Sequence, residues 1–254
     1  TQGVSSAASD VYKRQEVYPM DYEEFCDAIG SNYKLLQQIY DGGAAIGQAT
    51  NRKLMRDLRI YMAVGGMPQA VEAYVNGKNF SDIDMVKRQI ISLYEEDFKK
   101  IDATGRISAL YHAIPAQLAK ENRKFIYGVI KEGARAKDFE LAMEWLIDAG
   151  LIYKVNRVKK GGIPLSAYED FSAFKLFMLD TGLMGAMSGL PPQALLEGNI
   201  LFTDYKGAIT EQYVLQQLKS VKGLNIYYWS SDTSKGELDF LLQKEIYILS
   251  LIHI

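Results

Sequence analysis

Three acidic side chains in the last third of the sequence have the types and spacing of a cation site. Glu237 and Asp239 alternate in "GELDFLLQ", a segment with strand character, so both side chains should leave the same face. Glu211 lies within 204–219, whose helical periodicity puts it on an apolar face with Ala208. Because a buried carboxylate is costly unless it is paired or metal-bound, and Mg²⁺ prefers oxygen ligands, we predict a metal site. Its ligands would be Glu211 and Asp239, and all three acids would serve as nuclease-like catalytic residues.

Two alternatives to this metal site remain open from the sequence. Glu211 could instead pair with a lysine or contact nearby backbone groups. A metal-dependent nuclease would also need a lysine that positions the attacking water, and we expect it on the next strand as an acid-x-Lys pair. That strand begins at "EIYI", yet no lysine follows in "LSLIHI". Because that lysine is absent, we expect no nuclease activity from this sequence, and the acids are compatible with an active site in the parent protein or with an inactive one.

Basic side chains concentrate in the middle of the chain and could contact nucleic-acid phosphates. The candidates for nucleic-acid binding are Arg123, Lys124, Arg135, Lys137, Arg157, Lys159 and Lys160. Acidic residues are interspersed among them, so a solvated basic surface on a protein-binding module is an equally good interpretation.

The elements that would position these residues divide the chain into three parts. Residues 21–100 read as helices, with Pro68 in a first helical turn. Residues 105–165 predict short helices around Ile107–His112 and from Pro115, then the helix "KDFELAMEWLIDAG", the strand "LIYKVNRV", the turn "KKGG" and a second strand "IPLSAY". This order of elements is that of a winged helix.

Residues 166–248 alternate between strand and helix patterns. "AFKLFMLD" reads as a buried strand or the start of a helix, 204–219 as a helix, and "NIYYW" and "GELDFLLQ" as strands. The predicted fold class is α+β and predominantly helical, ending in a mixed α/β layer.

Composition excludes several classes of protein. The net charge of -2 rules out a globally basic nucleic-acid binder, and one cysteine (Cys26) and two histidines leave no Cys/His metal cluster. No apolar run reaches the roughly 20 residues of a membrane helix, and no P-loop motif occurs. We expect a cytoplasmic protein whose own sequence holds no nucleotide cofactor.

Both chain ends look foreign to the fold. "DVYKRQ" (10–15) and "LSLIHI" (249–254) can be encoded by the two strands of one DNA element, which looks like a transposase adapter used in sequencing libraries. We therefore expect 1–15 and 249–254 to be adapter-encoded scars, and the natural chain to be a fragment that was cut at both ends.

The segments between the scars resemble a known family. "EVYPMDYEEFCDAIG", "YMAVGGMPQAV", "LYEEDFKK", "FKLFMLDTGLM", "KGAITEQYV" and "YYWSSDTSKGELDFLL" are similar, in order, to the C-terminal part of bacterial and archaeal AAA-like P-loop ATPases. Those ATPases carry a C-terminal domain of unknown function that is similar to PD-(D/E)XK nucleases.

The resemblance implies an organisation and a set of partners. It implies a helical lid over 16–104 that follows an ATPase core, a winged-helix-like unit over 105–165, and a truncated restriction-endonuclease-like domain over 166–248. ATP and Mg²⁺ would act at a P-loop in the parent protein, which would engage DNA or a partner protein and could be an oligomer. Carried over by position, Glu211, Asp239 and Glu237 match the nuclease-like acids.

The first 15 residues provide a test of the expected scar. Their deletion should leave the melting temperature nearly unchanged, because the stretch has no apolar periodicity and unanchored termini contribute little to stability. Thermal unfolding of the full and shortened chains measures this. A melting temperature lowered by many degrees would show that the stretch packs against the fold.

Overall fold

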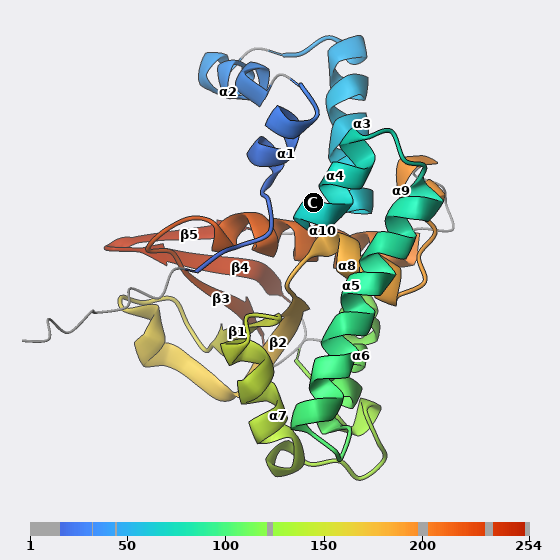
Figure 1. The fold of residues 1–254 in the computed structure, drawn as a ribbon. Coiled ribbons are helices and arrows are strands. Elements are labelled where there is room, and N and C mark those ends of the chain that lie inside the picture. The colour runs from blue at the N-terminus through green and yellow to red at the C-terminus, as the bar shows by residue number, and fades with distance from the viewer. Residues whose placement is uncertain are drawn as a thin grey trace, which may run out of the picture.

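The computed structural model describes residues 16–31, 33–43, 45–120, 124–197, 203–231 and 236–251. Within these ranges the chain forms ten α-helices and one five-stranded mixed sheet, so the α+β class with a majority of helix is confirmed. Figure 1 shows the N-terminal helices stacked above one side of the sheet and α5, α6 and α7 running down beside it. None of the described helices is long and apolar enough to cross a membrane. The expected scar at 1–15 lies outside the described residues.

Helices fill the N-terminal part as predicted. Their bounds are α1 Tyr22–Ala28, α2 Tyr33–Gly42, α3 Gln48–Val64, α4 Pro68–Val75 and α5 Phe80–Ile101. Pro68 begins α4, where its missing N–H costs no hydrogen bond. Along α5 the apolar stripe through Ile83, Ile90 and Phe98 is buried and holds the helix against the core.

The middle of the chain differs from the prediction at one proline. Instead of two short helices, α6 runs unbroken over Arg106–Ala119 with Pro115 inside it. Pro115 removes one helical hydrogen bond, but the buried stripe continues past it from Ile114 to Leu118, and this burial offsets the loss. The single turn η1 (Tyr127–Val129) and helix α7 (Ala136–Asp148) follow.

The sheet has the strand order β2-β1-β3-β4-β5. Its strands are β1 Ile152–Val158, β2 Glu169–Met178, β3 Asn225–Ser230, β4 Glu237–Lys244 and β5 Tyr247–Leu251. β1 pairs in parallel with β3, and the other neighbours are antiparallel. The strand interpretation of "AFKLFMLD" is therefore the correct one.

The expected second strand at "IPLSAY" is wrong. These residues form the single turn η2 (Leu165–Tyr168), and the partner strand of β1 starts only at Glu169. Leu165 is fully buried and its N–H donates to Oε1 of Gln243, 2.6 Å away, so this segment crosses toward β4. Two α-helices, α6 and α7, therefore precede β1 where three were expected, and β2 follows after the turn.

One sheet unites segments that the sequence assigned to different units. β1 comes from 105–165 and β3 from 166–248, yet Asn156 pairs with Tyr227 and Val158 with Trp229. The domain boundaries stay predictions, but the two units share a continuous hydrogen-bonded sheet. At its edge, Leu249–Leu251 of the expected scar extend β5 along β4, and 252–254 lie outside the described residues.

A buried carboxylate joins the N-terminal helices to the strand side of the fold. Asp180 has no exposed surface and precedes α8 (Thr181–Met187), where it accepts the N–H of Leu183 at 2.9 Å. It also accepts the N–H of Gly66, from the turn between α3 and α4, at 2.6 Å. We call this pair of contacts the Asp180 clamp. Burial raises the pKa of the Asp180 carboxyl, and the N–H donors oppose that rise.

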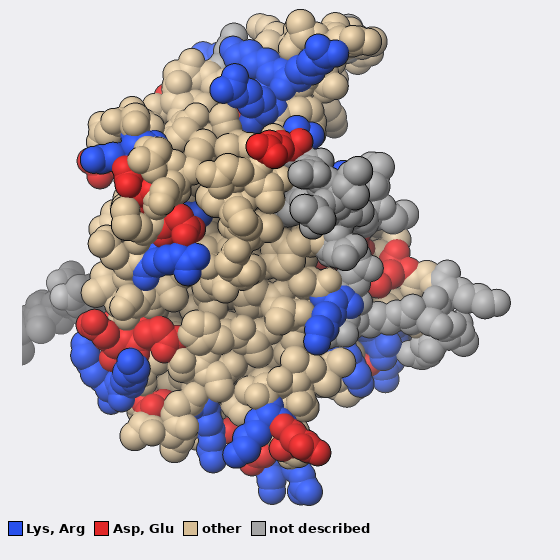
Figure 2. All heavy atoms as spheres, turned by 90° about the vertical axis from the view of Figure 1, so that its right-hand side faces the viewer, with Lys and Arg blue, Asp and Glu red and all other residues tan. Residues whose placement is uncertain are grey.

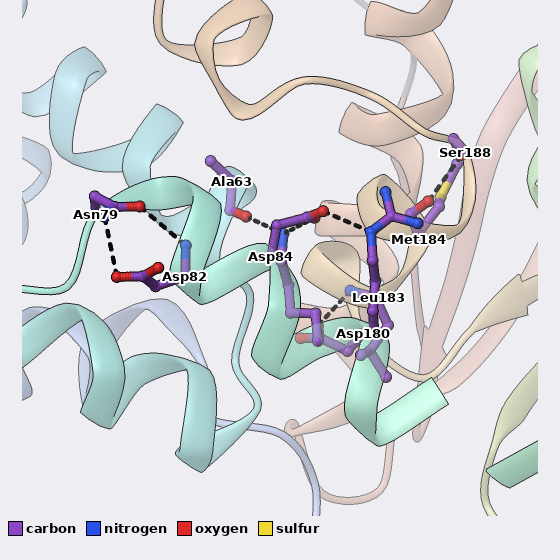
Figure 3. A network of polar contacts seen from close by, with 10 residues as sticks. Ala63, Asn79, Asp82, Asp84, Asp180, Leu183, Met184 and Ser188 are labelled. Carbon is purple, nitrogen blue, oxygen red and sulfur yellow. Dashed lines mark hydrogen bonds and ion pairs between the residues drawn. The ribbon is translucent and has the colours of Figure 1, made fainter. Parts of the chain in front are cut away.

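A buried lysine of α5 makes a second polar contact at the end of α3, next to the turn that contains Gly66. Lys87 of α5 donates from Nζ to the carbonyl of Ala63, 2.9 Å away, and so satisfies a carbonyl in the last turn of α3. Asp84 lies 3.5 Å from Lys87 Nζ. Figure 3 shows these contacts of α5 beside the Asp180–Leu183 cap of α8.

The last described helix adds polar contacts that reach from Asp180 to the start of α1. α10 (Thr203–Lys219) supplies Gln216, which accepts from Thr181 N–H and donates to Asp180 at 3.1 Å. Gln217 donates to the Tyr61 hydroxyl and accepts the N–H of Tyr22. Buried polar groups that are all bonded specify one arrangement of the packed helices.

Gly66 gives a direct test of this interface. An alanine Cβ there would lie 2.2 Å from the Met20 carbonyl oxygen and 2.8 Å from Gln216 Nε2, so the backbone would have to move. We expect Gly66→Ala to lower the free energy of unfolding by about 2–3 kcal/mol. Gly161→Ala is the control, because this residue is exposed, its Cβ would meet nothing within 4 Å, and its effect should stay within about 0.5 kcal/mol. Equal effects of the two substitutions in urea unfolding would contradict the close approach.

Candidate metal centre

Helix α10 places Glu211 at the sheet. Ala208, Ile209 and Leu215 are buried in the main core, and the Glu211 side chain among them is 13% exposed. The position of the helix is fixed by Gln212, which accepts the N–H of Met178 at 2.9 Å and donates to its carbonyl at 2.8 Å. Gln212 and Gln216 are buried as well, because α10 contacts neighbours on more than one side.

A β-bulge in β4 arranges the two acids of that strand. Opposite the step from Tyr227 to Trp229, β4 advances by three residues, from Leu241 to Leu238. Phe240 packs into the main core with α10, whereas Leu238 and Leu241 pack on the other side of the sheet. The bulge thus keeps Asp239 on the same side as Phe240, toward Glu211.

The three acids converge as the sequence predicted. One carboxylate oxygen from each of Glu211, Glu237 and Asp239 lies within 4.8 Å of the other two. Two ligands of one cation can lie about 4–5 Å apart at ligand distances of about 2.0–2.6 Å, so small side-chain adjustments would let all three bind it. Hard carboxylate donors from two elements fit Mg²⁺ or Mn²⁺, and the catalytic roles stay predictions.

A lysine that we did not predict points into this cluster. Lys175 of β2 lies 2.7 Å from Glu211 and 2.9 Å from Glu237, measured from Nζ to Oε1, and its side chain is 7% exposed. Its Nζ is also 5.3 Å from the centre of the Tyr228 ring. The available signal was a single charge inside the apolar run "AFKLFML", since a buried lysine requires a partner. We expected a lysine from the strand after β4, whereas this one comes from the opposite edge strand.

The electrostatics of the cluster favour a cation. Burial raises the pKa of Glu211 to about 7, and neighbouring Asp239 adds to the rise, while Lys175 opposes it. Burial alone would lower the pKa of Lys175, but Glu211 and Glu237 outweigh it and raise that pKa. One ammonium facing three carboxyl groups leaves an excess of negative charge that a divalent cation would balance.

The predicted basic turn lies at the same end of the sheet as these acids. Val158, the last residue of β1, pairs with Trp229, and Trp229 pairs with Leu238 beside Glu237. Trp229 also donates from its indole nitrogen to the Lys159 carbonyl at 3.2 Å. Lys159 and Lys160 are exposed, and Lys160 lies over the Tyr168 ring.

The remaining predicted basic residues have different surroundings. Arg157 is held by Asp170, and Lys124 is exposed beside a small cavity that Lys175 also lines. Arg135 and Lys137 are exposed at the start of α7, and Arg123 lies outside the described residues. Arg157 thus lies in the part of β1 that pairs with β3, and Lys159 and Lys160 follow directly after β1. Lys160 contacts Tyr168, which packs on the sheet face opposite Phe240, while Arg135 and Lys137 sit on a separate helix.

The fold and this centre define an α+β protein in which a carboxylate–lysine cluster lies between a mixed sheet and the helix α10. Residues 55–194 match the model of a domain of unknown function, DUF8612, which covers more than half of the chain, so the chain belongs to this family. The matched part contains Lys175 and Asp180 but none of the three acids. No curated protein and no solved structure matches the chain.

The ion pair beside the centre predicts a pH dependence of stability. Hydrogen bonds from Ser172 and Arg157 lower the pKa of Asp170 to about 2. A depressed pKa in the folded state contributes stability above the ordinary value of about 3.9, and this stability is lost as the pH falls through about 2. Asp170→Asn should therefore cost about 2 kcal/mol at neutral pH and almost nothing near pH 2.

Urea unfolding of this variant at several pH values measures the effect. Asp27→Asn, at an exposed position of α1, is the control and should change stability little at any pH. A cost of Asp170→Asn that does not vary with pH would mean that the Asp170 charge contributes nothing.

Proposed function

We propose that this protein binds a divalent cation at Glu211, Glu237 and Asp239 and acts there on a phosphodiester of DNA. The observation that carries the proposal is the convergence of three carboxylates within 4.8 Å, with the Lys175 ammonium in ion-pair contact with two of them. Acids and a lysine in one partly buried cluster are what cation-dependent phosphodiester hydrolysis requires.

The side chains would divide the work as follows. A divalent cation at the acids would supply Lewis-acid stabilisation of charge on the phosphate. Lys175, its two carboxylate partners then engaged elsewhere, would donate to the attacking water or to a phosphate oxygen. Lys159 and Lys160, exposed at the same end of the sheet, would hold the flanking phosphates of the strand.

The family resemblance places this activity in a larger proposal. It supports a prokaryotic AAA-like ATPase as the parent protein, in which ATP and Mg²⁺ act at a P-loop that this sequence does not contain. The winged-helix-like and nuclease-like parts would then engage DNA under the control of the ATPase, in the cytoplasm and as a possible oligomer.

A binding adaptor without catalysis is the second candidate. The observation that favours it is that Lys175 already pairs with Glu211 and Glu237, which would neutralise them as a structural ion cluster. In that case the acids hold β2, α10 and β4 together, and the surface engages DNA or a partner protein without cleaving it.

Thermal unfolding with and without millimolar Mn²⁺ tests the cation site. Binding to the native state alone at a hundredfold excess over Kd adds about 2.7 kcal/mol, which raises the melting temperature of a chain of this size by about 5–10 °C. The double substitution Glu211→Gln with Asp239→Asn should abolish this shift. The control Glu140→Gln with Glu144→Gln removes two exposed acids of α7 and should retain it.

A cleavage assay then separates the two candidates. The unmodified protein should nick supercoiled plasmid in Mn²⁺, and the Glu211→Gln, Asp239→Asn variant should not. A shift without cleavage would favour the adaptor with a cation site. No shift in the unmodified protein, or the same shift in both double variants, would refute the site itself.

A further inference from the structure

Five basic side chains gather far from the acidic cluster. Arg52, Lys53, Arg56 and Arg59 lie on α3, and Lys78 follows α4. All but Arg59, which is half-buried, are exposed. Figure 2 shows Lys and Arg side chains gathered at the top of the molecule, the end at which α3 lies in Figure 1.

These cations lack acidic partners in the described part of the chain. The ion pairs there join other residues, and none of the five takes part. The one acid among them, Asp57, accepts a hydrogen bond from the Ser31 hydroxyl at 2.9 Å. Arg52 and Arg56 are four residues apart and Arg56 and Arg59 three, so their like charges repel on the surface of α3. An anion would relieve this repulsion.

Three of the cations line an open groove of about 720 Å³ between α1, α3 and α4. Lys53, Arg56 and Lys78 face it. The aromatic side chain in its wall is Tyr74, whose ring stacks on Phe25 and is tilted against Phe80. Because that ring already packs within the protein, the groove offers charge to a ligand and little to a nucleotide base.

We propose that α3 and this groove bind the phosphate backbone of DNA. The cations from Arg52 to Arg59 extend over about 10 Å of helix at about 1.5 Å per residue, which exceeds one phosphate group and suits a continuous backbone. The choice of DNA rests on the function proposed above. The groove would act as a second contact that holds the duplex independently of sequence, while the carboxylate cluster acts on a phosphodiester elsewhere along it.

Fluorescence anisotropy with a labelled duplex of about 20 base pairs, from about 50 to about 200 mM salt, tests this contact. The groove variant combines Lys53→Gln, Arg56→Gln and Lys78→Gln. Each lost phosphate contact reduces the slope of log K against log salt by about 0.9, so the slope should fall by up to about 2.7 and Kd should rise at least about tenfold at low salt.

The control variant combines Lys99→Gln, Lys222→Gln and Lys244→Gln, three exposed lysines outside the groove with the same total change in charge. Its Kd should stay within about twofold of the unmodified protein if the groove is specific. Equal weakening by the two variants, or no binding of duplex by the unmodified protein, would overturn the proposal. Binding of a polyglutamate peptide at the groove without binding of duplex would overturn it in favour of an acidic protein partner.

The cation measurement keeps this proposal separable from the previous one. The groove variant should keep the melting temperature of the unmodified protein in metal-free buffer, which shows that it is folded. It should also show the same Mn²⁺-dependent change in melting temperature as the unmodified protein. The Glu211→Gln, Asp239→Asn variant should in turn retain the salt slope. Loss of duplex binding in the groove variant therefore supports the groove even where the acidic cluster binds no cation.

Discussion

The Asp180 carboxylate is the contact on which the arrangement of the whole molecule depends. It lies directly after β2, caps α8, and holds the Gly66 N–H from the turn between α3 and α4. Without its oxygens two backbone N–H groups would be buried without partners, a cost that few other interactions in a small protein can offset. The carboxylate thereby fixes the N-terminal helices against the end of the sheet.

The geometry of the acidic cluster depends on the same part of the fold, the end of β2 next to Asp180. β2 carries Lys175 a few residues before Asp180, and Gln212 of α10 binds both backbone groups of Met178 between them. Glu211 precedes Gln212 in the chain, so the two hydrogen bonds that align α10 with β2 also place Glu211 beside Lys175. The candidate chemistry thus depends on backbone hydrogen bonds made by an uncharged side chain one position away.

The sequence predicted those parts of the fold that depend on local periodicity. The helices within 21–100, the strands β3 and β4, and the shared face of Glu237 and Asp239 follow from spacing alone. The features that the sequence did not predict depend on tertiary contacts. Helix α6 continues through Pro115 because its buried side chains continue past that residue. The segment "IPLSAY" does not pair with β1 because the Leu165 N–H instead donates to Gln243. Lys175 was missed for the same reason, since its partners come from α10 and β4.

The basic turn and the acids show how units assigned separately can meet at one end of one sheet. They were expected in a winged-helix-like part and a nuclease-like part, yet β1 and β3 run side by side and deliver both to one end of the sheet. The basic groove at α3 lies on the other side of the Asp180 clamp. A ligand that contacts both would therefore meet a rigid spacing set by buried polar contacts.

The parallel pairing of β1 with β3 also bears on the order in which the chain folds. Antiparallel neighbours such as β1 and β2 can pair after a short loop closes. The pairing of Asn156 in β1 with Tyr227 in β3 requires the closure of a much longer segment, which contains β2 and three helices. Closing that long loop costs entropy before any contact rewards it, so the centre of the sheet should form late. The edge of β1 that β3 finally covers would stay open in the meantime, which makes the nascent chain most vulnerable to mispairing just before α10 docks.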